Sequence, residues 1–323
     1  MSRRTRRTLL IVAAVLVLLA LAIFLRSKAP PEAARLLPES DGIVYINLKA
    51  IRTFSHKDFK PPNRVPEYQQ FIDAIGIDPE RDLDQVAIAL HRMPDPTGPN
   101  GPVAYSMVLV GKITGQPLNA WLDSHATSRE TYVGHTIYSI PSDGRTVRVA
   151  QIGYDMVAVS NTPTTEQIHS MLDRHRAAAL PFSGSSLLER HFHDVPLLSL
   201  AWGVGQIGLP FSESGSIHVF GLALPLEPDS TIIASVAPAL PVPGSLGALR
   251  FRVEEIAPSQ DKAASQAADL ATLVTLTRGL AQPLGESPAN DAFKELLNTA
   301  EVTQHGERVV ITATVPASAL SHL

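Results

Sequence analysis

The sequence contains no cysteine, which excludes disulfides, thiol catalysis and metal or iron–sulfur sites built on thiolates. It also has no Asn-x-Ser/Thr acceptor for N-glycosylation. Aromatic residues make up only 6% of the chain and two of them are tryptophan, a poor basis for a surface that stacks sugars or single-stranded nucleic acid. We therefore expect Trp121 and Trp202 to be core residues.

Charge is also scarce and unevenly placed. Charged residues account for 18% and hydrophobic residues for 45%, a composition typical of a globular protein. Residues 1–28 hold six Lys and Arg and no acid, so the remainder has 21 basic and 31 acidic groups, a net charge of −10. Phosphate recognition needs clustered Lys and Arg, so this acidic body argues against a nucleic-acid partner.

Only one long hydrophobic run is present, seventeen apolar residues at 9–25. As a helix it spans roughly 25 Å, close to the thickness of a hydrocarbon core. Four arginines precede it within residues 1–8. The positive-inside rule then predicts a basic cytoplasmic tail at 1–8, a transmembrane helix at 9–25 and an extracytoplasmic, periplasmic body.

A cleaved signal peptide is the alternative reading of this segment, because its basic start would look the same. The apolar run is long for a signal peptide, and Arg26 and Lys28 follow it directly with no clean cleavage site. We therefore favour an uncleaved anchor of the cytoplasmic membrane. Residues 26–40 contain Pro30 and Pro31 and are predicted to form a stalk between anchor and body.

From residue 41 onward, short apolar runs alternate with turn residues and amphipathic stretches. Alternating patterns rich in β-branched residues predict strands, and apolar spacing of three and four predicts helices. The predicted strands are 43–48, 86–91, 103–113, 131–140, 146–152, 156–161, 197–202, 217–224, 231–238, 247–256 and 306–315. The predicted helices are 67–76, 116–126, 162–178, 259–280 and 288–299.

These elements predict an α+β fold class, in which an N-terminal transmembrane helix precedes largely antiparallel sheets with covering helices. Residues 41–180 and 181–323 each contain a strand series and helices. This repetition favours two α+β halves that are diverged copies of one unit, although no residue-by-residue alignment joins them.

Several phrases resemble segments of anchored bacterial envelope proteins whose domain families have no known function. They are LLPESDGIVYINL, AIGIDPERDLDQVAIAL, YVGHTIYSI and the closing NTAEVTQHGERVVITATVP. The resemblance covers about half of the chain and rests on residues that mark turns and the ends of strands and helices, not on catalytic residues. It implies a location in the bacterial cell envelope and carries no functional site with it.

Two motifs match enzyme signatures superficially. GVGQIG at 203–208 has dinucleotide-binding spacing, but a Pro-containing loop follows where a helix should start. Ser259 and Lys262 have the S-x-x-K spacing of penicillin-interacting enzymes, but the companion elements are missing. We interpret the first as a loop and Ser259 as a helix N-cap.

Two clusters could bind metal ions. Asp78, Glu80, Asp82 and Asp84 alternate like the ligands of a calcium loop, without its glycine or its closing glutamate. In the segment 191–194, the imidazoles of His191 and His193 could give two ligands of a zinc or copper site, with His169 or His175 as a third. We interpret the acidic run as a solvated turn and the histidines as a polar loop.

The sequence assigns no catalytic, cofactor-binding or metal-binding residue, and no cofactor. The leading hypothesis is a non-enzymatic interaction or binding module whose partners are the membrane and other envelope proteins. A hydrolase whose residues converge only in three dimensions is the first alternative, and a pocket of perturbed titratable groups would favour it. A lipid or small-ligand carrier is the second, and a large apolar cavity would favour that.

Overall fold

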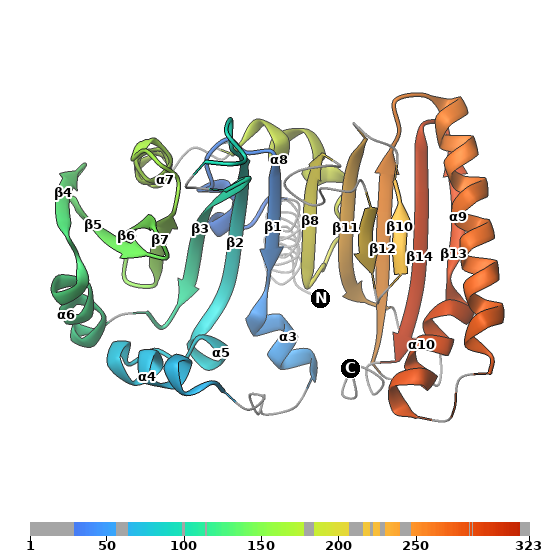
Figure 1. Ribbon diagram of the computed structural model, residues 1–323, viewed down its shortest axis with the longest axis horizontal. Helices are drawn as coiled ribbons and strands as arrows, with labels where there is room; N and C mark the ends of the chain where they lie inside the picture. Colours follow the sequence, from blue (N-terminus) through green and yellow to red (C-terminus); the bar gives the residue numbers. More distant parts are fainter. Residues whose placement is uncertain are drawn as a thin grey trace, which may run out of the picture.

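The computed structural model describes residues 29–55, 64–98, 101–113, 115–177, 184–206, 216–219, 222–226, 230–239, 247–283, 285 and 287–316. The transmembrane helix predicted at 9–25 lies outside these residues. Within them, no helix combines the length and apolarity needed to cross a bilayer. The described chain has a mixed α+β fold built on one large antiparallel sheet (Figure 1).

The elements follow in chain order. Up to residue 177 they are α2 (Glu32–Arg35), β1 (Gly42–Ile46), α3 (Leu48–Ser55), α4 (Pro66–Ile75), α5 (Pro79–Asp82), β2 (Leu83–Arg92), β3 (Val103–Gly111), α6 (Gln116–His125), β4 (Ser128–Tyr132), β5 (His135–Ser142), β6 (Arg145–Gln151), β7 (Met156–Ser160) and α7 (Glu166–Arg176). After it they are α8 (Ser186–His191), the 3-10 helix η1 (Phe192–Asp194), β8 (Ala201–Gln206), β9 (Ser216–Val219), β10 (Leu222–Pro225), β11 (Thr231–Pro238), β12 (Ala248–Ile256), α9 (Gln260–Ala281), α10 (Pro288–Thr299), β13 (Glu301–His305) and β14 (Arg308–Pro316).

Twelve strands form one sheet in the order β13-β14-β12-β11-β8-β1-β2-β3-β7-β6-β5-β4. β9 and β10 pair separately as a hairpin. The predicted halves meet where β1 pairs antiparallel with β8, at Val44 opposite Gly203. Both halves therefore share one sheet, which runs from β4 to β13 beside α9 (Figure 1).

The two faces of the sheet follow from the strand registers. We call face A the one that carries Ile43 and Tyr45 of β1, and face B the one that carries Val44 and Ile46. Helices α2, α7 and α8 pack on face A of the central and first-half strands. On face B, α4 and α6 cover part of the first half, and α9 and α10 cover the second half.

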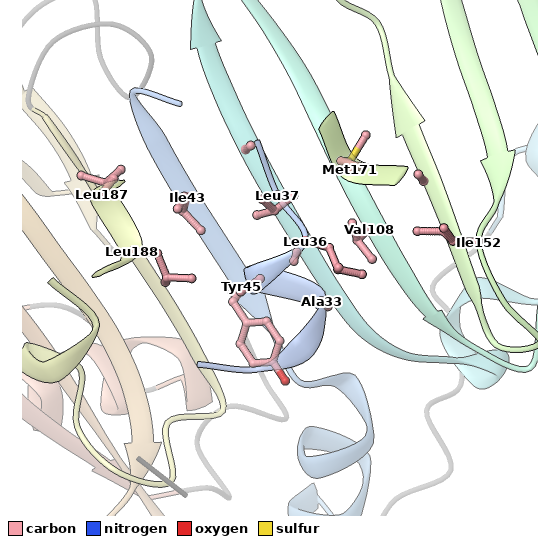
Figure 2. Packing of buried hydrophobic residues seen from close by; sticks show 14 of the residues in the cluster. Ala33, Leu36, Leu37, Ile43, Tyr45, Val108, Ile152, Met171, Leu187 and Leu188 are labelled. Carbon is pink, nitrogen blue, oxygen red and sulfur yellow. The ribbon is translucent and has the colours of Figure 1, made fainter. Parts of the chain in front are cut away.

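The predicted stalk at 26–40 is wrong over much of its length. Residues 32–35 form α2, and Ala33, Ala34, Leu36 and Leu37 are at most 1% exposed. Figure 2 shows Leu36 and Leu37 over the sheet, between Leu188 of α8 and Met171 of α7. The Pro-rich start does not extend this segment outward, because its apolar side chains complete the core on face A.

Other boundaries also differ from the predictions. The strand predicted at 131–140 is two strands, β4 and β5, joined by a tight turn in which Val133 and Gly134 have positive φ angles of 42° and 84°. Glycine reaches that region without steric cost. The strand predicted at 197–202 begins only at Ala201, after a turn closed by the bond from Ser199 N to the Pro196 carbonyl oxygen.

The last strands and helices agree with their predictions closely. Ser259 and Ser287 are the N-caps of α9 and α10, and each hydroxyl accepts a backbone N–H of the first turn. The terminal hairpin turns at Gly306, which has a φ of 60°. The helix predicted from 162 starts later, at Glu166, because Thr162 instead hydrogen-bonds to Ser160 and to the carbonyl oxygen of Thr164.

Candidate functional site

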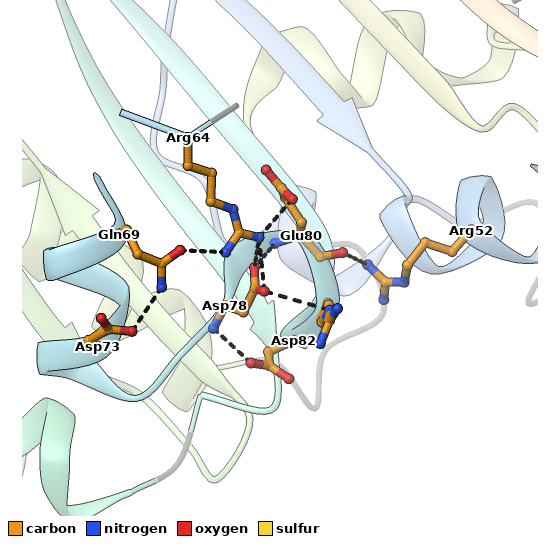
Figure 3. A network of polar contacts seen from close by, with 8 residues as sticks. Arg52, Arg64, Gln69, Asp73, Asp78, Glu80 and Asp82 are labelled. Atoms are coloured by element: carbon orange, nitrogen blue, oxygen red, sulfur yellow. Dashed lines mark hydrogen bonds and ion pairs between the residues drawn. The ribbon is translucent and has the colours of Figure 1, made fainter. Parts of the chain in front are cut away.

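The acidic run at 78–84 is an ion-pair network and not a calcium loop. Arg64 bonds to the carboxylates of Asp78 and Glu80 at 2.9 Å each. Asp82 accepts the backbone N–H of Asp78, and Arg52 pairs with Asp84 at 2.9 Å. Figure 3 shows Arg64 beside Asp78 and Glu80, and Arg52 reaching the backbone of Glu80 from the other side. Because the carboxylates already have protein donors, the network stabilises the turn and offers no cluster for a cation.

The histidines near residue 191 do not assemble a metal centre. Both histidines lie near the carboxylate of Asp194, His191 Nδ1 at 3.8 Å and His193 Nε2 at 3.4 Å. The same carboxylate accepts a hydrogen bond from Arg308 at 2.9 Å. Arg308 also bonds to Glu254, which is 1% exposed. Burial lowers the pKa of His191, against the opposing effect of Asp194. Ion pairs through Arg308 and Glu254 therefore hold residues 191–194 against β14 and β12.

The proposed third ligands lie elsewhere. His169 stacks on Tyr132 with ring centroids 3.8 Å apart and contacts the Glu130 carboxylate at 2.9 Å. His175 lies beside His135, with centroids 6.2 Å apart. In the part of the chain that the structure describes, no group of three or more His, Asp or Glu side chains is placed to hold a metal ion.

The two enzyme-like motifs also have structural roles. Residues 203–206 of GVGQIG belong to β8, and the rest of that motif lies outside the described residues. Ser259 Oγ accepts the backbone N–H of Lys262 at 3.3 Å, and the Lys262 side chain is exposed. That geometry is an N-cap, as expected, because a nucleophile would need the lysine amine rather than its backbone.

A buried serine–histidine pair on face A was missed by the sequence analysis. His91 Nε2 lies 3.0 Å from Ser106 Oγ, and His91 also donates to the backbone carbonyl oxygen of Glu39. Ser106 Oγ continues to Ser160 Oγ at 3.2 Å, and Ser160 to Thr162 at 2.8 Å. This chain of hydrogen bonds links β2, β3 and the end of β7, and its residues are brought together only by the pairing of these strands, so no local motif could indicate it.

Ser106 and His91 are the residue types of a nucleophile and its base, but their side chains are not accessible to a substrate. Ser106 and Ser160 are both 0% exposed, and His91 is 8% exposed. Burial lowers the pKa of His91, and the nearby Asp41 carboxylate and the hydrogen bond to the Glu39 carbonyl oxygen only partly oppose this. A hydroxyl sealed in the core cannot reach a substrate, so the chain of hydrogen bonds satisfies polar groups inside an apolar layer.

A further group of apolar residues lies on face B at the centre of the sheet. Its residues share one face of β11, β8, β1 and β2 and are half-buried; they are Val44, Ile46, Ile88, Leu90, Gly203 and Ala234, called the apolar strip below. None of the four apolar clusters of the described residues includes any of them. Sheet faces of this composition are normally covered.

Two open depressions lie away from the strip. One, of about 480 Å³, is lined by residues of α7 such as Glu166 and Asp173. The other, of about 540 Å³, lies along β5 and β6 near Asp123 and Tyr154. The first is the outer surface of a single helix. Neither depression is lined by His91 or Ser106, so neither has the features of an active site.

Comparisons with known proteins give little beyond these observations. No family model matches the chain, and no curated protein matches it. Among solved structures, crystal form III of TP0453 is 12% identical with a TM-score of 0.41, over 90% of this chain and 97% of that one. Crystal form IV of TP0453 is 11% identical with a TM-score of 0.42, over 91% and 97%. At these TM-scores the likeness carries no argument.

Proposed function

We propose that the chain is a single-pass protein of the bacterial cytoplasmic membrane whose periplasmic α+β body is a non-enzymatic interaction module of the cell envelope. The observation that supports the binding role is the apolar strip, because its half-buried residues belong to none of the packed apolar clusters of the described residues, and a partner can bury the apolar area that they leave accessible. The anchoring rests on the apolar run at 9–25 and the arginines before it.

The buried core of α2 supports a close link between anchor and body. Only residues 26–31 separate the apolar run from α2, a reach of at most about 20 Å when fully extended. Leu36 and Leu37 then fix the chain to face A. On this proposal the body stays next to the bilayer, where its partners would also be membrane or envelope proteins.

We also propose that the two halves are diverged copies. In each, three strands run outward from the centre, β1-β2-β3 and β8-β11-β12. A helical segment follows, and the last strand of the half then returns to pair with the third, β7 with β3 and β14 with β12. The antiparallel pairing of β1 with β8 relates the two halves as an approximate two-fold axis would.

A hydrolase is the second candidate, and only the His91–Ser106 hydrogen bond favours it. For this pair to act, the segment that buries Ser106 would have to open. Reaction of the intact protein with a fluorophosphonate probe tests this directly. Labelling of Ser106 that is lost in His91→Ala would support the hydrolase, and absence of labelling would remove it.

The proposed function is tested by comparing the full-length chain with residues 29–323 exported without the anchor. We expect alkaline extraction to leave the full-length chain in the membrane and to release the shorter form. Crosslinking in intact cells, followed by mass spectrometry, should recover the same envelope partners with both forms. Cytoplasmic partners would contradict the topology, and the absence of any partner would contradict the interaction role.

A further inference from the structure

The buried hydrogen-bond chain that starts at His91 ends on a backbone carbonyl group. His91 Nε2 lies 3.0 Å from Ser106 Oγ, and Ser106 Oγ lies 3.2 Å from Ser160 Oγ. Ser160 Oγ lies 2.8 Å from Thr162 Oγ1, which donates to the Thr164 carbonyl oxygen at 3.1 Å. Three hydroxyl groups in a row therefore connect an imidazole to a group that can only accept.

When His91 is neutral, the hydroxyl groups point toward the imidazole. Nε2 faces Ser106, so Nδ1 is the nitrogen that donates to the Glu39 backbone. Nε2 then accepts, and Ser106 donates to it. Ser160 can in turn donate to Ser106 Oγ, while the backbone N–H of Thr162 donates to Ser160 Oγ at 3.3 Å. Both ring nitrogens and the hydroxyl groups beside them are therefore hydrogen-bonded.

When His91 is protonated, the same hydroxyl groups point the other way. Both ring nitrogens now donate, so Nε2 donates to Ser106 Oγ, and Ser106 donates to Ser160. Ser160 then donates to Thr162, and Thr162 donates to the Thr164 carbonyl oxygen. Because a hydroxyl group both donates and accepts, rotation of the O–H bonds is enough to serve either form of the imidazole.

The charged groups near the imidazole come from the connection between α2 and β1 and from the elements that it touches. The Asp41 carboxylate of this connection favours the protonated imidazole, and it also accepts the backbone N–H of Arg92 at 2.7 Å. The Glu39 carboxylate of the same connection is paired with Arg174 of α7 at 3.0 Å. Asp41 is therefore the charge that acts on His91 most directly.

At the other end of the chain, Arg148 of β6 donates to the Thr162 carbonyl oxygen at 2.7 Å. Burial acts against Asp41, and the net pKa of His91 is lowered. Neutral His91 therefore contributes stability that is present above its unfolded pKa of about 6.5 and is lost as the pH falls through the folded value. The hydroxyl groups limit that loss, because they keep the buried imidazolium hydrogen-bonded.

We propose that His91 and the three hydroxyl groups form a pH-sensitive switch inside the folded body, in which the imidazole takes up a proton in mild acid and the hydrogen bonds of Ser106 and Ser160 reverse. The reversal acts on the connection between α2 and β1, because an imidazolium is a stronger donor to the Glu39 carbonyl oxygen than a neutral imidazole. This switch goes beyond the proposed interaction role and does not depend on it.

The first test is the tautomer and the titration of His91, measured by NMR. The full-length chain, carrying isotope-labelled histidine, is studied in detergent micelles, and the His91 signals are identified by their loss in His91→Gln. We expect Nδ1 to carry the hydrogen in the neutral ring, and the second proton to bind below about pH 6.5 in the folded protein. A neutral ring with its hydrogen on Nε2 would overturn the proposal, since Nε2 would then donate in both forms. Protonation that occurs only together with unfolding would overturn it too.

The second test removes a hydroxyl group that does not contact the imidazole. Thr162→Val keeps the shape of the side chain but takes from Ser160 the acceptor that it needs only when His91 is protonated. We expect the pKa of His91 to fall by at least about one unit, because the protonated form then leaves a buried hydroxyl hydrogen unsatisfied. Thr162→Ser keeps the hydroxyl group and is the matched control, in which the pKa of His91 should be unchanged.

Ser160→Ala is the second variant, since it removes the acceptor of Ser106 in the protonated form and should also lower the pKa of His91. Thermal melting shows which variants keep the fold. A side chain at 162 that serves only the packing of the fold would not change the titration of an imidazole two hydroxyl groups away. Equal pKa values of His91 in Thr162→Val and Thr162→Ser, or an unchanged value in Ser160→Ala, would therefore contradict the switch.

Discussion

The two halves of the sheet bury different faces. In the first half, β2 and β3 are apolar on both sides, with α2 and α7 on face A and α4 and α6 on part of face B. In the second half, α9 and α10 cover face B, α8 covers face A only over β8 and β11, and face A of β12 and β14 carries polar residues such as Arg250 and Thr314. The comparison shows that the sequence of a strand indicates whether one or both of its faces are covered. Apolar and polar side chains alternate along a strand only where one face meets water.

The largest expected effect lies in the doubly covered half, on the segment predicted to be a stalk. Leu37→Ala removes a side chain that is 0% exposed, and we expect a loss of about 3 kcal/mol in the free energy of unfolding. Glu32→Ala, on the exposed side of α2, is the control and should change it by less than about 0.5 kcal/mol. Urea denaturation measures both. Equal, small effects would mean that α2 does not belong to the core.

In the second half, the ion pairs on the polar face A of β12 and β14 should contribute measurably to stability. Arg308→Met removes the partner that Asp194 and Glu254 share. We expect a loss of about 1–2 kcal/mol, reduced by solvent because the Arg308 side chain is 40% exposed. Arg250→Met on the same face should be nearly neutral. A salt titration of the unfolding midpoint separates the two, and equal midpoints for both variants would contradict this assignment.

The helices that cover face B of the second half should depend on their caps. Ser259→Ala and Ser287→Ala each remove a hydroxyl that accepts a first-turn N–H, at a cost of about 1 kcal/mol. Lys262→Ala should change thermal stability little, since Lys262 is exposed. A loss from Lys262→Ala larger than that from Ser259→Ala would indicate a role for this lysine beyond the helix surface.

The smallest effect concerns the junction of the two halves, where Glu39 receives bonds from Ser186 and Arg174. Burial raises the pKa of Glu39, but the bonds from the Ser186 hydroxyl, the Ser186 backbone and Arg174 outweigh it, and the net pKa is lowered. A lowered folded-state pKa contributes stability above the unfolded value, and this is lost as the pH falls through the folded value.

Glu39→Gln should therefore be less stable than the parent chain at pH 7, and the difference should vanish at low pH. We expect less than about 1 kcal/mol, because the Glu39 side chain is 60% exposed. Unfolding by urea at pH 7 and at pH 3 measures it. A difference that persists unchanged at pH 3 would assign the effect to packing and not to charge.

Local patterns predicted much of the fold. Alternation located most strands, and the cap Ser259 located the start of α9, because these signals act over a few residues. The β4–β5 turn was missed, since Val133 carries a positive φ that its side chain normally disfavours. The late start of β8 was missed because apolar residues at 197 and 198 lie exposed in the preceding turn.

The candidate sites also differ in how much of them a local sequence pattern could predict. The sequence could show that the acidic run lacked the glycine and the closing glutamate of a calcium loop, because that spacing is local. It could not show whether His169 or His175 lies near His191 and His193, because these residues are on separate elements. It could not show the His91–Ser106 bond, which forms across the β2–β3 register, or that Ser106 is sealed. Whether a residue is reachable depends on every element packed above it, and no single segment contains that information.

By itself, the sequence determined the α+β composition, the antiparallel character of the strands and the position of one long apolar run, because each follows from the nearest few side chains. The tertiary structure alone decided that both halves form one sheet, that Leu36 and Leu37 are core, and that the apolar strip belongs to none of the packed apolar clusters of the described residues. These outcomes depend on which distant segments bury the same apolar surface, and many pairings of segments satisfy the local pattern equally well.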